Sequence, residues 1–157
     1  MKILIGLAKK IDNVVVRRII NKREPDLTVN YDEEHIYMNR WWVIPRNRIF
    51  NIYLHQFEWP DPDHTLHDHP WFSMSFVLFS GYSEQIVQYG GCHKYYGYRI
   101  GDLIFRSPWN THRISNVLGN ISRTLFITGP ILRKWGFHNV VLGWEEAEAY
   151  KARDLKL

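Results

Sequence analysis

The stretch TLHDHPWFSMSFVLFSG, residues 65–81, joins a pair of histidines to a long apolar run that ends at a glycine. In an extended chain, residues i and i+2 project to the same side, so His67 and His69 face one way and Asp68 faces the other. Neutral imidazole is a common ligand of zinc, iron, copper and nickel. Two histidines on one strand need at least one further donor from a neighbouring strand, and alone they also fit a polar surface loop.

The rest of the chain has the composition of a folded protein. Of its 157 residues, 45% are hydrophobic and 15% aromatic, which predicts a single domain over 1–157. The net charge of +4 comes without a polybasic run, so a nucleic-acid partner is not expected. The lone cysteine, Cys92, suits a reducing, cytoplasmic compartment. No apolar run approaches the roughly 20 residues of a membrane span, so a membrane partner is not expected either.

Apolar and β-branched runs separated by turn residues predict many short strands from residue 49 onward. Their regular spacing is typical of a β-sandwich or barrel, with a core at about residues 45–130. The polar segment 143–157 lacks β-branched residues and predicts a helix or tail. We expect strands at 49–57, 71–80, 83–89, 93–100, 111–117 and 122–128.

Glycines mark the expected turns between these strands. Gly81 is expected to end the 71–80 strand, so that residues 83–89 return beside it as a hairpin. Residues 118–120 are expected to form a turn as well. Near the start of the chain, residues 2–7 suit a short strand, and residues 14–20 suit a strand or a short helix.

A second motif, GDLIFRSPWNTHRISN, occupies residues 101–116. Gly101 begins a strand, Pro108 tightens a turn, and His112 opens the next strand with Asn116 four residues on. The two stretches together resemble the motifs of the cupin superfamily, roughly G-x5-H-x-H-x3-4-E-x6-G and G-x5-7-P-x-G-x2-H-x3-N. The matching residues are His67, His69, Gly81, Gly101, Pro108, His112 and Asn116.

The resemblance covers about residues 49–130. It implies an all-β cupin fold, a double-stranded β-helix or jelly-roll barrel, with small N- and C-terminal additions. It also implies a divalent metal at the mouth of the barrel, held by His67, His69 and His112.

Two positions depart from the family pattern. The family glutamate would fall near Ser73 or Met74, and neither is a carboxylate. Asn110 replaces the glycine of the second motif, which the tolerance of asparagine for positive φ allows. Glu84 is a candidate substitute for the glutamate, but the turn expected at Gly81 would place it away from His69.

Three histidines with open coordination positions resemble the iron site of cysteine dioxygenase and related thiol dioxygenases, and the HDH pair followed by an apolar strand resembles them too. The wider pattern RWWVIPRNRIFNIYLHQF…LHDHPW…TLFITGP resembles small cupin-like proteins of phages and bacteria that have no assigned reaction. The first of these resemblances implies an Fe(II)-dependent oxygenase acting on an anionic small molecule, with Zn, Ni or Mn as other candidates for the metal, and the second supports the fold. Two alternatives stay open. One is a non-catalytic cupin that binds a small ligand, and the other is a sugar-nucleotide epimerase with His67 or His112 as base and Tyr53 as acid.

Four further side chains are candidates for the site. Tyr53 and His55 share a strand face and are candidate catalytic residues, although a packed aromatic strand explains them equally well. Arg106 precedes the His112 loop and is the candidate anion contact, because a guanidinium binds carboxylate or phosphate through two hydrogen bonds. Trp71 is a candidate pocket wall, although core packing is its more frequent role. The family resemblance also suggests a homodimer, and the roles of His64 and His138 stay open.

Overall fold

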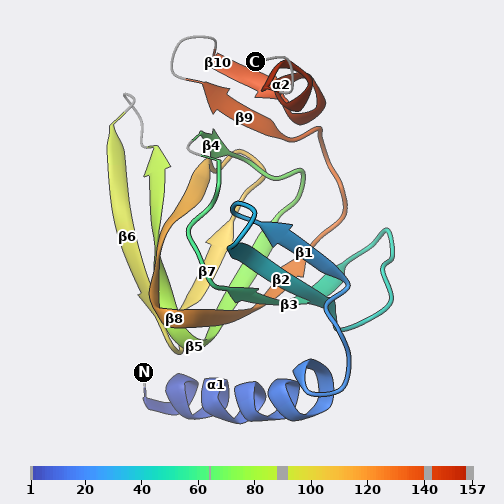
Figure 1. Ribbon diagram of the computed structural model, residues 1–157, viewed down its shortest axis with the longest axis vertical. Helices are drawn as coiled ribbons and strands as arrows, with labels where there is room; N and C mark the ends of the chain where they lie inside the picture. The colour runs from blue at the N-terminus through green and yellow to red at the C-terminus, as the bar shows by residue number, and fades with distance from the viewer. Residues whose placement is uncertain (1, 64, 88–91, 140–142, 155–157) are drawn as a thin grey trace.

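The computed structural model describes residues 2–63, 65–87, 92–139 and 143–154 (Figure 1). Within these residues, ten strands form one largely antiparallel sheet with an α-helix near each end of the chain. Neither α-helix has the length and apolar character that crossing a membrane requires, as far as the described residues go. The elements are α1 (Lys2–Val15), the π-helical turn η1 (Val16–Ile20), β1 (Leu27–Asn30), β2 (Ile36–Trp42), β3 (Asn51–Phe57), β4 (Leu66–His67), β5 (Ser73–Val87), β6 (His93–Arg99), β7 (Leu103–Arg106), β8 (His112–Thr128), β9 (Gly136–Asn139), β10 (Gly143–Glu146) and α2 (Ala147–Asp154).

Two long strands, β5 and β8, organise the fold. They pair with each other along almost their whole length, from Ser73↔Thr128 to Ile86↔His112. The second half of β8 also pairs with β3, and its first residue pairs with β4, so β8 curves around the molecule (Figure 1). The result is an all-β jelly-roll barrel, which confirms the predicted fold class.

The expected turns at Gly81 and 118–120 are wrong, because β5 and β8 run through both places. The two strands bend together there, with Gly81 paired to Leu118 and register shifts on either side. Ser80 and Gly119 take up the bend with φ of 55° and 69°, and the Ser80 hydroxyl donates to the Leu118 carbonyl at 2.6 Å. Bulges of this kind let one long strand bend around the corner of a barrel. Glycines occur both at such bends and at hairpin turns, so the sequence alone does not distinguish the two.

The expected short strand at 2–7 is also wrong, because these residues belong to helix α1. Ala8, Asp12 and Val15 are its buried residues and follow helical spacing. They pack the helix across one end of the barrel against a cluster that includes Leu54 and Leu78 (Figure 1). The Asp12 carboxylate binds the guanidinium of Arg123 on β8 at 2.7 Å, which fixes the helix to the barrel.

A C-terminal unit of β9, β10 and α2 lies at the opposite end of the molecule from α1 (Figure 1). Strand β9 continues the sheet beside β4, and β10 pairs with β9. The helix α2 falls within the segment expected as a helix or tail, and its Ala147 and Tyr150 pack on Phe137.

The buried carboxylate of Asp68, directly after β4, holds the C-terminal unit against the barrel through hydrogen bonds. Asp68 is 1% exposed and lies between two of the candidate metal ligands. Its oxygens accept hydrogen bonds from four donors, over distances of 2.7 to 3.1 Å. The donors are Arg133 Nη1, the Gly136 backbone N–H, His138 Nε2 and Trp144 Nε1.

Candidate metal centre

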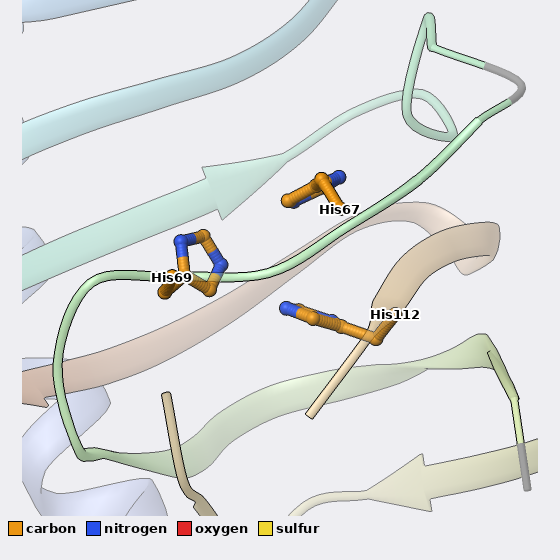
Figure 2. Close-up of side chains that lie close together, drawn as sticks. All are labelled: His67, His69 and His112. Carbon is orange, nitrogen blue, oxygen red and sulfur yellow. The ribbon is translucent and has the colours of Figure 1, made fainter. Parts of the chain in front are cut away.

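The structure brings together the three histidines that the sequence predicts as metal ligands. His67 and His112 are paired residues of β4 and β8, and His69 follows two residues after His67. The rings point toward one another (Figure 2), with centroids 5.1, 5.1 and 5.2 Å apart. One nitrogen from each ring lies within 4.8 Å of the others. A metal ion at the centre of this triangle is therefore within reach of all three rings.

The protonation state of the histidines suits coordination. Burial lowers the pKa of His67 to about 4, and it holds the pKa values of His69 and His112 well below their usual range. All three rings are therefore neutral near pH 7, and each keeps one lone pair for a metal. Neither ring nitrogen of His112 makes a hydrogen bond, although both are buried. A bound metal would give Nε2 a partner, while Nδ1 lies 3.3 Å from Glu84 Oε1. Imidazole donors fit zinc, iron and nickel.

The three histidines line a cavity of about 330 Å³ inside the barrel. Its walls are mainly apolar and aromatic, and they continue the buried cluster that includes Phe57, Tyr82 and Ile114. The C-terminal unit supplies Phe137 and Lys151 to the lining, and Trp135 lies just before it. A cavity of this size holds a small molecule together with a metal.

Three of the other predicted site residues line the cavity, and one does not. His55, Trp71 and Arg106 are part of the lining, and the Trp71 ring lies nearly parallel to that of His69, with centroids 6.1 Å apart. Tyr53 is buried against His55 and is outside the described cavity lining. An acid role for Tyr53 toward a molecule in this cavity gains no support from this position.

Glu84 lies beside His112. The expectation that it would lie away from His69 assumed a hairpin turn at Gly81, and the structure has a continuous strand there. Its carboxylate is 1% exposed, and Oε1 is 3.3 Å from His112 Nδ1. The other oxygen, Oε2, accepts a hydrogen bond from Arg106 Nη2. Burial raises the pKa of Glu84, and the charge of Arg106 opposes that rise. The Arg106 guanidinium therefore already has a carboxylate partner in the cavity wall.

The bulge of β5 decides that Glu84 points into the barrel. Before the bulge, Ser73 and Ser75 are buried; after it, Tyr82 and Glu84 are buried. The inward positions therefore change from odd to even numbers, because the bulge adds a residue to one strand of the pair. Strict alternation from Ser75 would point Glu84 outward.

The sequence analysis missed two further cavity residues, Arg40 and Asp61. Arg40 Nε donates to His55 Nε2 at 2.9 Å, in register across β2 and β3. Burial and the Arg40 charge hold the pKa of His55 well below its usual range. Asp61 Oδ2 is 3.5 Å from His67 Nδ1, and burial raises the pKa of Asp61 to about 7. Alternation along β2 could have found Arg40, whereas the segment EWPDPDHT carries no sign that Asp61 turns inward.

The remaining histidine and cysteine candidates lie apart from the cluster. His138 binds Asp68 rather than the three histidines. Cys92 is exposed just before β6. His64 lies outside the described residues.

Comparison with known proteins identifies the fold. No protein-family model and no curated protein sequence matches this chain. Among solved structures, the oxalate decarboxylase of Lactobacillus farciminis in complex with formate has a TM-score of 0.53 and 13% identity, over 74% of this chain and 33% of that chain. A Bacillus subtilis oxalate decarboxylase has a TM-score of 0.52 and 15% identity, over 83% of this chain and 33% of that one.

A smaller protein of Ralstonia eutropha JMP134, provisionally assigned as a mannose-6-phosphate isomerase, gives a TM-score of 0.51 and 15% identity, over 59% of this chain and 84% of that chain. These neighbours share the all-β barrel described above. The chain has the cupin fold, and it spans about a third of the length of the oxalate decarboxylases.

Proposed function

We propose that this protein is a metal-binding cupin that holds Fe(II) with His67, His69 and His112 and oxidises an anionic small molecule. The observation that carries the proposal is the convergence of three neutral imidazoles within 4.8 Å at a cavity of about 330 Å³. A divalent metal is also supported by the Mn(II) centres of the Bacillus subtilis oxalate decarboxylase, which shares the fold. Bound iron would supply the chemistry of dioxygen activation, and three histidines leave coordination positions open.

We assign the anion contact to Arg40 rather than to Arg106. Arg106 is neutralised by Glu84, whereas Arg40 makes no ion pair with any residue that the structure describes. Its Nε is held by His55, and its guanidinium lies 5.1 Å from the centre of the Tyr53 ring. A guanidinium fixed in a mainly apolar cavity attracts a carboxylate or phosphate strongly, because little water competes for it. Arg40 would bind and orient the anion while the aromatic walls exclude water.

Elemental analysis of protein purified without added metal tests the proposal first. We expect a stoichiometric divalent metal that is lost in His67→Ala, with His93→Ala as the control because His93 is an exposed histidine on β6. Oxygen uptake by the iron-loaded protein is then measured with small thiol carboxylates such as cysteine and with carboxylates that lack a thiol. Metal binding without oxygen uptake for any of them would support the ligand-binding alternative. Absence of metal from a correctly folded wild-type protein would refute the metal centre.

A further inference from the structure

Two buried carboxylates stand directly behind two of the three histidines. Asp61 Oδ2 lies 3.5 Å from His67 Nδ1, and Glu84 Oε1 lies 3.3 Å from His112 Nδ1. Both acids are almost inaccessible, at 6% and 1% exposure. In each case the carboxylate faces Nδ1, the nitrogen nearer to the backbone, and leaves Nε2 of the ring for another partner.

Each carboxylate is held in place through its second oxygen. Asp61 Oδ1 accepts the backbone N–H of Asp63 at 3.1 Å. Glu84 Oε2 accepts a hydrogen bond from Arg106 Nη2. The oxygen that faces the histidine is therefore fixed in direction, and neither carboxylate can turn away without losing the hydrogen bond to its second oxygen.

A carboxylate at Nδ1 decides which nitrogen of a neutral imidazole keeps the proton. The proton is favoured on the nitrogen that faces the negative charge, and the lone pair then lies on the other nitrogen. The same contact makes the ring a stronger donor to a metal. We propose that Asp61 and Glu84 are positioning residues that hold His67 and His112 in the Nδ1–H form, so that both present Nε2 to the metal. This proposal rests on the metal centre proposed above.

The third histidine has different surroundings. His69 lies against the rings of Trp71 and Phe126, with centroids 6.1 and 6.3 Å away, and it has no ion pair within the described part of the chain. The site is thus asymmetric, because His67 and His112 each have a carboxylate beside Nδ1 and His69 has none among the described residues. Arg106 offsets the charge of Glu84, but Asp61 and Glu84 together still place negative charge beside the metal site. An anionic molecule would therefore approach from the side of Arg40.

The isosteric variants Asp61→Asn and Glu84→Gln test the proposal, with Asp12→Asn as the control. Asp12 is also a buried carboxylate, but it pairs with Arg123 beneath the barrel and does not line the cavity. Nitrogen NMR of the metal-free protein, recorded above the pKa of Asp61, reports which ring nitrogen of each histidine carries the proton. Competition with a chelator then gives the Kd for Zn(II), which binds imidazole without redox chemistry.

In the wild type we expect the Nδ1–H form at both His67 and His112. Asp61→Asn should disturb this form only at His67, and Glu84→Gln only at His112. Each variant should weaken Zn(II) binding by about 10–100-fold, and the control should bind like the wild type. If Glu84→Gln fails to fold because Arg106 loses its partner, Asp61→Asn alone decides the outcome.

Nε2–H forms at His67 and His112 in the wild type, or unchanged Kd values in folded variants, would overturn the role of the two carboxylates. A wild-type protein that shows the Nδ1–H forms but binds no divalent metal would instead overturn the proposed function. The NMR measurement needs no metal, so the two failures are distinguishable.

Discussion

Replacing Arg106 with methionine should make Glu84 an unpaired charge inside the barrel. Arg106 and Glu84 are 9% and 1% exposed, and their ion pair is surrounded by Tyr98, His112 and the cavity wall. Methionine fills most of the arginine volume without its charge. Breaking a buried pair from one side typically costs about 3–5 kcal/mol in the free energy of unfolding, because the remaining charge is left without compensation.

The cost should depend on pH, and its sign follows from Glu84. Burial already raises the pKa of Glu84, and Arg106 is the charge that opposes the rise. Without Arg106 the folded-state pKa rises further, while the unfolded chain titrates in the usual range. Between these two values the folded variant binds more protons than the unfolded chain, so its stability falls as the pH rises. The difference from wild type is therefore larger at about pH 8 than at about pH 5.

Urea unfolding of the metal-free protein, followed by tryptophan fluorescence at both pH values, measures this cost. The double variant Arg106→Met/Glu84→Leu is the matched control, because it removes both charges and leaves an apolar wall. It should recover most of the stability lost in the single variant. A cost below about 1 kcal/mol at the higher pH, as for an exposed pair, or an equal cost at both pH values, would refute the reasoning.

Three further predictions concern the cavity and the barrel corner. Arg40→Met should weaken the binding of cysteine to the metal-loaded protein by about 1.5–3 kcal/mol and leave the metal content of the protein unchanged. Titration calorimetry measures the first quantity and elemental analysis the second. An unchanged Kd for cysteine would exclude Arg40 as the anion contact. The metal-free protein should lose stability as the pH falls from about 6.5 toward 4, because the folded-state pKa of His67 is lowered to about 4 and the unfolded chain takes up protons first. His67 alone accounts for about 3 kcal/mol of this loss, so denaturation curves of His67→Ala over the same range should be flatter. Gly81→Ala should lower the free energy of unfolding by about 1–3 kcal/mol, because the added Cβ would lie 2.1 Å from the Tyr98 carbonyl oxygen. Gly97→Ala on the paired strand is the control, because its Cβ would lie 3.9 Å from the nearest atom. Equal melting temperatures for the two variants would contradict this account.

Strand periodicity predicted a sandwich or barrel, and the resemblance to the two cupin motifs predicted the histidine cluster. Two separated motifs fixed the order and spacing of His67, His69 and His112, and alternation in 49–57 placed His55 and Tyr53 on the same strand face. These features depend on local spacing and strand periodicity, which a single sequence displays directly.

Residues whose position depends on long-range geometry escaped prediction. The bend shared by β5 and β8 was predicted as a hairpin turn at Gly81, so Glu84 was expected beside the 71–80 strand, whereas it pairs with β6 and β8. The burial of Asp61 depends on the path of a loop, and its backbone N–H donates to the Ile114 carbonyl far along the chain. Helix α1 is stabilised by packing on the barrel and by the pair of Asp12 with Arg123, neither of which local patterns reveal.

The four hydrogen bonds to the Asp68 carboxylate bear on the order in which the site forms during synthesis. The donors that fix Asp68, and with it the backbone between His67 and His69, all come from residues 133–144, up to 76 positions later in the chain. A chain emerging from the ribosome can pair β5 with β8 before these donors exist, because synthesis proceeds from the N-terminus. The segment that carries His67 and His69 therefore gains its first donor to Asp68 with Arg133 and its last with Trp144. We expect tight metal capture to be one of the last events in the maturation of this protein.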